Sequence, residues 1–137
     1  MKILLIHGPN LNLLGERDKN HYGEITLAEL EEQVKTWSTA EILTFQSNHE
    51  GELIDFIQQN PADGIIINPG ALAHYSYALH DALLDAKISC VEVHLSDTEN
   101  REDWRKSSVT AAACLAKISG KGTEGYKEAL NLLVDAN

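Results

Sequence analysis

Two residues on one short segment, Glu92 and His94, have the types and spacing of an acid–base pair. They lie in the run CVEVHLS at 90–96, whose alternation is typical of a β-strand, so both side chains point to the same face. There the carboxylate of Glu92 can orient the His94 imidazole and favour its protonated form, which suits a general acid. A core histidine satisfied by a neighbouring carboxylate is an equally simple interpretation. The position of His94 at the end of the strand, followed by Ser96, favours a function.

The arginines are a second group with chemical potential. The chain has only three: Arg17 in a long loop near the N-terminus, and Arg101 and Arg105 just beyond His94. On a helix, Arg101 and Arg105 would be neighbours on one face. A single arginine is usually a surface charge, but three near two strand ends favour a bound carboxylate or phosphate. The net charge of -10 does not oppose this, since local cations bind an anion that the overall field would repel.

Tyr22 lies five residues after Arg17, in a loop that spans residues 8–23. A phenol has an ordinary pKa of about 10, so its use as a base requires a neighbouring cation such as the Arg17 guanidinium. Packing at the turn before Gly23 is the alternative and, on position alone, the more common role. Because strand-to-helix connections typically take about 2–6 residues, we interpret this longer loop as a lid over a site.

His74 and Asp81 form a weaker candidate pair after the third predicted strand. His74 is expected at the start of a helix over 74–86, where it could also cap or pack. Asp81 follows seven residues later, two helical turns along the same face. A surface carboxylate is the simplest interpretation of Asp81.

Strand-like and helix-like segments alternate along the chain and must position these groups. The predicted strands are 3–6, 41–45, 64–67, 89–95 and 114–118. The predicted helices begin at 26, 47, 74 and 125, the first two with capping boxes, Thr26–Glu29 and Ser47–Glu50. His49 and Glu50 are therefore assigned to capping. Short apolar strands in this order predict a parallel sheet covered by helices on both faces.

We therefore expect one α/β domain over residues 1–137, a flavodoxin-like three-layer sandwich with a five-stranded parallel sheet. The order of the strands cannot be read from the sequence. Ligands of such sheets bind beyond the carboxyl ends of the strands, which selects four segments here. These are 7–10, 46–48, 68–70 and 94–96.

Composition excludes several classes of function. The charge of -10 leaves no basic stripe for nucleic acid or for an anionic membrane surface. The N-terminal apolar run is too short for a signal peptide, and no run approaches the roughly 18 residues of a membrane span. Cys90 and Cys114 lie in apolar surroundings without CxxC spacing, so we expect reduced core thiols in a cytoplasmic protein. The six histidines show no metal-ligand spacing, so no metal is expected.

Five motifs in register resemble the type II dehydroquinases, the 3-dehydroquinate dehydratases, over nearly the whole chain. They are GPNLNLLGERDKNHYG, QSNHEGELIDFIQ, IIINPGALAHYSYALHDAL, VEVHLS and REDWR. The resemblance implies a flavodoxin-like subunit that assembles as trimers into a dodecamer. It also implies a lyase of the shikimate pathway, or of quinate catabolism in some organisms. The enzyme would dehydrate 3-dehydroquinate to 3-dehydroshikimate by anti elimination through an enolate, without cofactor or metal.

The resemblance also implies roles for the catalytic residues, position by position. Tyr22 would be the base that removes a proton from the carbon beside the ketone, kept ionised by Arg17. A water held near Asn10 would stabilise the enolate. His94, oriented by Glu92, would protonate the leaving hydroxyl.

For the substrate, the resemblance implies a carboxylate held on the backbone at Leu95 and Ser96. Further contacts fall to four residues: hydroxyls would be held by Asn68, His74 and Arg105, and the lid or the acid would be positioned by Arg101. Asp81 would reach the site of a neighbouring subunit, so the trimer would be part of the active site.

The chain departs from the family pattern at several positions, among them His7, Tyr75, His80 and residues 97–100. None of these removes a proposed catalytic group. His80 stands where an arginine is usual, which affects ion pairing between subunits, and Tyr75 alters packing near the pocket.

Other functions remain open from the sequence. A phosphate-receiving signalling domain would need an acidic cluster after the first strand, and a flavin carrier would need a hydroxyl- and glycine-rich phosphate loop there. Residues 7–10, HGPN, provide neither. A binding protein that keeps the fold without turnover is a further alternative.

Overall fold

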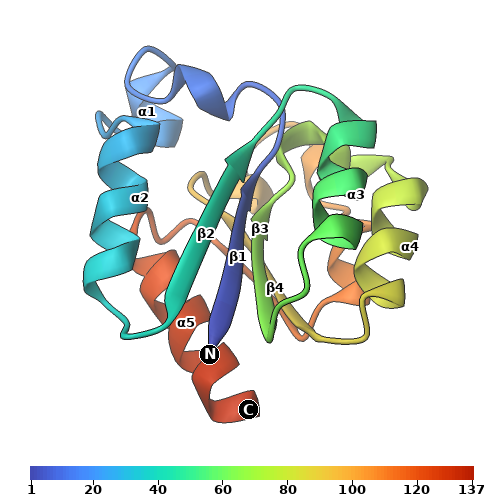
Figure 1. Ribbon diagram of the computed structural model, residues 1–137. Coiled ribbons are helices and arrows are strands. Elements are labelled where there is room, and N and C mark those ends of the chain that lie inside the picture. Colours follow the sequence, from blue (N-terminus) through green and yellow to red (C-terminus); the bar gives the residue numbers. More distant parts are fainter.

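All five strands are parallel in the computed structural model, which describes residues 1–137 (Figure 1). The strands are β1 (Lys2–His7), β2 (Glu41–Gln46), β3 (Gly64–Asn68), β4 (Ser89–His94) and β5 (Ala116–Ser119). The helices are α1 (Lys19–Tyr22), α2 (Leu27–Thr36), α3 (Glu50–Gln59), α4 (Tyr77–Asp85) and α5 (Glu124–Ala136). The strand order β2-β1-β3-β4-β5 is the flavodoxin-like order, so the predicted fold class is confirmed.

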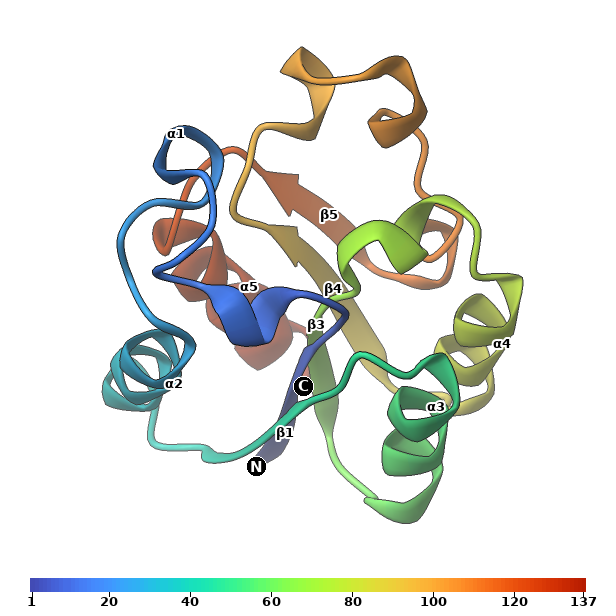
Figure 2. The same cartoon turned by 90° about the horizontal axis from the view of Figure 1, so that it is seen from above.

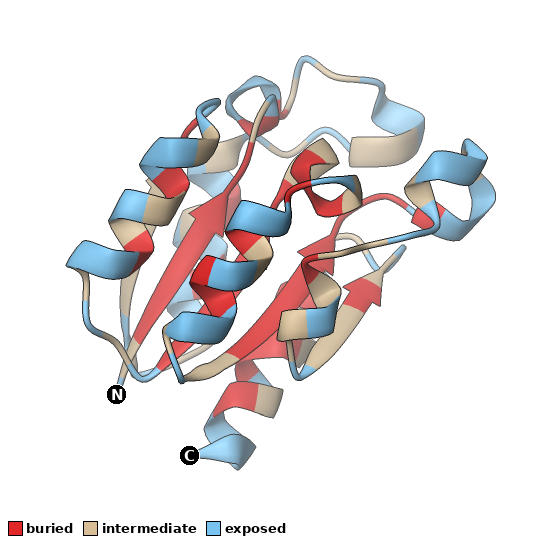
Figure 3. Cartoon of the chain, turned by 90° about the vertical axis from the view of Figure 1, so that its right-hand side faces the viewer, coloured by how far each residue is buried: buried red, intermediate tan, exposed pale blue.

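Two apolar cores fill the space between the sheet and its helices. One face of the sheet packs against α2 and α5, and the other packs against α3 and α4 (Figure 1). Alternation along β1 divides its side chains between these cores, with Leu5 on the first side and Leu4 on the second. The central strands are buried, whereas the outer faces of the helices are exposed (Figure 3). This is the burial pattern expected of a parallel sheet covered on both faces.

Helix starts test the capping predictions directly. The Thr26 hydroxyl accepts a hydrogen bond from the Glu29 amide at 3.2 Å and begins α2, as predicted. The second predicted box is wrong in detail, because Ser47 contacts the Glu52 carboxylate while Glu50 contacts Ser76. No side chain caps α3, whose N-cap residue is His49.

Two further helix predictions need correction. Residues Gly70–His74 form a 3₁₀ turn, and α4 begins only after Ser76, whose hydroxyl accepts from the Leu79 amide at 3.0 Å. His74 and Asp81 therefore do not share a helix face. Two short 3₁₀ turns, Thr98–Asn100 and Asp103–Arg105, replace the helix considered for residues 101–105.

The loops after β1 and β3 touch each other at the carboxyl edge of the sheet. A Cβ atom on Gly8 would lie 2.3 Å from the Pro69 carbonyl oxygen, and Gly70 has a φ of +60°. Both positions therefore need glycine. The contact holds the segments after β1 and β3 together, and Asn10 and Asn68 flank it. No helix of the structure is long and apolar enough to cross a membrane.

Candidate functional site

A polar pocket lies at the carboxyl edge of the sheet, where the loops after β1, β3 and β4 meet. In the view onto this edge, the loop that carries α1 and the loop after β4 rise above the strands (Figure 2). The pocket has a volume of about 100 Å³. Its lining comprises Pro9, Asn10, Leu11, Arg17, Tyr22, Asn68, Gly70, Ala71, His74, His94, Ser96, Thr98, Arg101 and Arg105. Three of the four segments selected from the sequence thus contribute to one cavity; 46–48 lies outside the lining.

The Tyr22 hydroxyl lies between two guanidinium groups. Its oxygen accepts hydrogen bonds from Arg17 Nη2 at 2.9 Å and from Arg101 Nη1 at 2.7 Å. The Arg17 guanidinium also stacks over the Tyr22 ring at 3.7 Å from its centroid. Two cationic donors thus converge on one phenolic oxygen. The sequence predicted the contact with Arg17, and the structure adds Arg101.

The three arginines converge, as their positions in the sequence suggested. Burial and the two neighbouring guanidinium groups lower the pKa of Arg17 below its ordinary value, against the attraction of Tyr22. Arg105 stacks over Trp104 at 4.0 Å and contacts the Glu102 carboxylate. Positive charge gathered in one cavity is suited to an anionic ligand.

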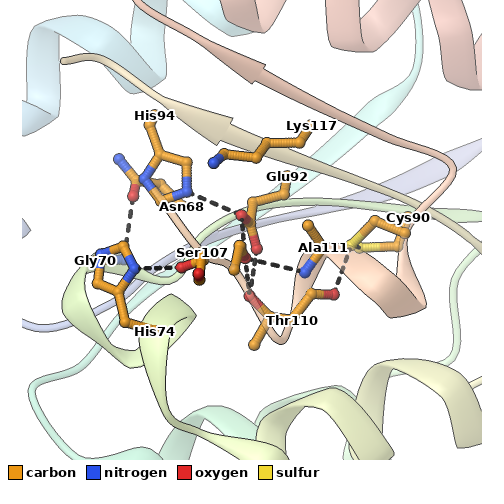
Figure 4. A network of polar contacts seen from close by, with 12 residues as sticks. Asn68, Gly70, His74, Cys90, Glu92, His94, Ser107, Thr110, Ala111 and Lys117 are labelled. Atoms are coloured by element: carbon orange, nitrogen blue, oxygen red, sulfur yellow. Dashed lines mark hydrogen bonds and ion pairs between the residues drawn. The ribbon is translucent and has the colours of Figure 1, made fainter. Parts of the chain in front are cut away.

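Glu92 and His94 form the predicted pair. His94 Nε2 lies 2.9 Å from Glu92 Oε2, and the Glu92 side chain is fully buried (Figure 4). Burial raises the pKa of Glu92, but the hydrogen bond and charge of His94 and two hydroxyl donors outweigh it, so the pKa lies below its ordinary value. An ionised Glu92 accepts the Nε2 proton and leaves Nδ1 of His94 to the pocket.

The structure identifies site residues that the sequence did not single out. Ser108 and Thr110 donate hydrogen bonds to the Glu92 carboxylate, and Lys117 is the neighbour of Glu92 in the register of β4 and β5. Thr98 lines the pocket with a buried hydroxyl that has no hydrogen-bond partner in the protein. No periodic pattern marks these positions, because they lie in irregular loops or on a neighbouring strand.

Asn68 and His74 supply further polar groups to the pocket lining. Asn68 Oδ1 accepts from the Gly70 amide at 3.1 Å, and its Nδ2 lies 3.5 Å from the Tyr126 hydroxyl. His74 Nδ1 donates to the Ser107 carbonyl at 2.6 Å, which leaves Nε2 as an acceptor. Burial, opposed by that hydrogen bond, lowers the pKa of His74 below its ordinary value. His74 is therefore a neutral acceptor for a ligand hydroxyl.

Asn10 also lies on the rim of the pocket, in the left-handed conformation with a φ of 72°. Its backbone amide donates to Asn48 Oδ1 at 3.0 Å, which fixes the start of the loop.

Three predicted site residues, Glu92, Asp81 and Leu95, are not among the residues that line this pocket, and Glu92 reaches it only through its contact with His94. The Asp81 side chain is 74% exposed, contacts His80, and does not line the cavity. The Leu95 side chain packs into the core with α2 and α5, so only its backbone is available to a ligand. The residues gathered in the pocket are those of acid–base chemistry on a small anion.

Comparison with known proteins places this geometry in context. The family model described as dehydroquinase class II matches residues 1–134. A 3-dehydroquinate dehydratase of Thermotoga neapolitana is 50% identical over 95% of this chain and 92% of its own. One from Clostridium beijerinckii is also 50% identical, over 97% of this chain and 95% of its own.

Solved structures of type II dehydroquinases also match this chain. The type II dehydroquinase of Butyrivibrio crossotus superimposes with a TM-score of 0.94 at 46% identity and covers 98% of this chain and 97% of its own. The type II dehydroquinase of Propionibacterium acnes gives a TM-score of 0.92 at 34% identity, over 98% of this chain and 96% of its own.

Proposed function

The chain belongs to the class II dehydroquinase family, and we propose that its pocket dehydrates 3-dehydroquinate to 3-dehydroshikimate in the shikimate pathway. The observation that carries this proposal is the pairing of a phenol between two guanidinium groups with a buried carboxylate–imidazole dyad in one cavity. Elimination of water beside a ketone needs one group that removes a proton from carbon and another that protonates the leaving hydroxyl.

Tyr22 acts as the base in this scheme. Its phenolate, held by Arg17 and Arg101, takes the proton from the carbon beside the ketone, and the electron pair forms an enolate. A water at Asn10 donates to the enolate oxygen and stabilises its charge. The guanidinium groups also act as a clamp that keeps the loop closed over the ligand.

His94 acts as the acid. The enolate collapses to a carbon–carbon double bond, the carbon–oxygen bond to the hydroxyl breaks, and His94 delivers the proton that makes the leaving group water. Glu92 holds the Nε2 side of the ring, so Nδ1 is the atom that faces the ligand. We propose that the base and the acid act from opposite sides of the substrate, as an anti elimination requires.

The remaining polar groups bind the substrate. The carboxylate lies on the backbone at Leu95 and Ser96, and the Arg101 guanidinium stays close, since it donates to Ser96 Oγ at 3.3 Å. Asn68, His74 and Arg105 hold the hydroxyls.

We propose that trimers of this chain assemble into a dodecamer and that Asp81 completes the pocket of a neighbouring subunit. Its exposed carboxylate has no role in its own pocket. Exposed aromatic side chains nearby, Tyr75 and Tyr77, provide apolar contact area for such an interface. Light scattering on eluted protein tests the assembly, and Asp81→Asn tests whether the carboxylate affects turnover.

We also propose that the enzyme works in the cytoplasm. Its two cysteines are unbonded although their Sγ atoms lie 3.2 Å apart, which suits a reducing compartment.

The decisive experiment is an ultraviolet assay of purified protein with 3-dehydroquinate, because the product is a conjugated enone. We expect turnover that chelator does not reduce. Folded protein that shows no absorbance change would contradict the proposal and favour a binding protein without turnover.

A further inference from the structure

We infer that Thr110 and Ser108 are positioning residues that act on the general acid through Glu92. This inference rests on the proposed function, since it assigns their role to the step in which His94 protonates the leaving group. Both residues lie in the loop between β4 and β5, away from the pocket lining, and neither touches the ligand cavity.

The proton count of the network fixes the direction of each hydrogen bond. Glu92 Oε2 accepts hydrogen bonds from His94 Nε2 at 2.9 Å and from Ser108 Oγ at 2.7 Å. Its Oε1 accepts from the Thr110 hydroxyl, and Figure 4 shows His94 and Thr110 on either side of the carboxylate. A hydroxyl carries one proton, so Ser108 and Thr110 each donate that proton to the Glu92 carboxylate. The two hydroxyl oxygens, Ser108 Oγ and Thr110 Oγ1, lie 3.2 Å apart and then have no proton between them. An ionised Glu92 accepts both protons.

The backbone holds both hydroxyls in place before any ligand arrives. The Ala111 amide donates to Ser108 Oγ at 3.1 Å, which leaves the Ser108 proton pointing to Glu92. Thr110 is completely buried, and its carbonyl accepts from Cys114 Sγ at 3.4 Å. The short 3₁₀ turn Ala111–Ala113 lies between these two anchors. The loop is thus a preformed cradle for a carboxylate with a fixed orientation.

The cradle explains how the Glu92 carboxylate can stay buried and charged. Glu92 has no exposed surface, so burial alone would favour its neutral form, which cannot hold a proton on His94 Nε2. Three donors compensate for the lost water. Without the Thr110 donor, Oε1 would have no partner among the hydrogen bonds of the structure, and the carboxylate would be free to rotate away from the imidazole.

Thr110→Val is the sharpest test, because valine keeps the shape and removes only the hydroxyl. We expect kcat to fall about tenfold with KM nearly unchanged, the loss expected for one donor to a buried charge. Thr110→Ser keeps the hydroxyl and is the matched control, and it should retain most of the activity. A Thr110→Val enzyme with wild-type kcat, or a Thr110→Ser enzyme as slow as Thr110→Val, would overturn the inference.

A double-mutant cycle shows whether Thr110 works through Glu92. In a Glu92→Gln background, Thr110→Val should cause little further loss of kcat, since the anion that it serves is gone. Losses that multiply in the double variant would overturn the inference.

A second readout needs no turnover and so separates this inference from the proposed function. The destabilisation of Thr110→Val against wild type should shrink as pH falls below the ordinary carboxyl range, because the hydroxyl stabilises only the charged Glu92. The other ionisable groups around Glu92 are His94, Cys90, Lys117 and His74. Both proteins contain these groups, so their contributions drop out of the difference between the two melting temperatures. A difference in melting temperature that is constant with pH would indicate packing alone and overturn the inference.

Discussion

The pocket has two halves, one with the proposed acid and one with the proposed base, and they are built differently. The acid half, Glu92 and His94, lies on β4 inside the sheet, with side-chain exposures of 0% and 7%. The base half, Arg17 and Tyr22, lies in a long loop and is only half-buried. The acid is therefore part of the core, and altering it affects folding as well as turnover. The base is assembled by loop contacts, so it can be altered with little effect on stability.

The contacts of the two halves show the same contrast. Glu92 is held by His94 and by two hydroxyls from the loop between β4 and β5, of which Thr110 is fully buried, whereas Tyr22 is held by two guanidinium groups from separate loops. Arg101 links the halves, because it donates both to Tyr22 and to Ser96 beyond β4. The predicted role of the N-terminal loop as a lid stays a prediction, and it would place any movement in the loop-borne half.

Tyr22→Phe should separate the two halves most clearly. It removes the base alone, so we expect kcat to fall about 10²–10⁴-fold. The unfolding free energy should change by less than about 0.5 kcal/mol, because the hydroxyl belongs to a surface loop. Initial rates measure kcat, and thermal melts measure the change in stability. A variant with near-wild-type kcat would show that Tyr22 is not the base.

Arg17→Ala should come next. Loss of one of two cationic donors to the phenolate should lower kcat about 10–100-fold, with Arg101 preserving the remainder. Lys19→Ala is a matched control, since it removes a positive charge from the same loop at a side chain that is 64% exposed. Equal losses in both variants would mean that overall charge, rather than contact with Tyr22, is responsible.

Glu92→Gln should lower both the stability of the fold and the turnover rate. The amide keeps the size but meets three donors with only one acceptor oxygen, so the unfolding free energy should fall by about 1–3 kcal/mol, together with kcat. Denaturant unfolding measures the first effect. Glu24→Gln, at a side chain that is 79% exposed, should leave stability unchanged. A Glu92→Gln protein as stable as wild type would remove the distinction between the two halves.

The smallest expected effect is a pH dependence of the difference in stability between wild type and Glu92→Gln. Because the pKa of Glu92 is lower in the folded protein than its ordinary value of 4.5, its ionisation stabilises the fold above about pH 4.5. This stabilisation is lost as pH falls through the lower folded value. The gap in melting temperature between wild type and Glu92→Gln should therefore narrow from pH 7 towards pH 3. A gap that widens would contradict the sign of the shift.

The difference between the halves also explains what the sequence could reveal. Glu92 and His94 were predictable because alternation along a buried strand fixes which side chains share a face, and Val91 and Val93 do occupy the opposite core. The Thr26 cap was predictable because its hydrogen bond is local. The start of α4 was missed because Ser76 resembles many other serines until the turn before it is known.

Contacts between segments far apart in the chain left no pattern to read. Tyr22 and Arg101 are separated by 79 positions, and Thr110 lies 18 positions from Glu92. Nothing in the composition of either loop specifies the partner, because folding of the sheet brings the segments together. The predicted approach of Asp81 to another subunit stays a prediction, since one chain contains only its exposed carboxylate.

Because the arginines all lie in one place, the pocket can be labelled selectively by a reagent that modifies arginine. All three arginines of the chain line the cavity, whereas its eight lysines lie outside the lining. An α-dicarbonyl reagent specific for guanidinium groups would therefore label this pocket and nothing else on the protein. Protection of those arginines, followed by intact mass, would report occupancy of the pocket without any need for turnover.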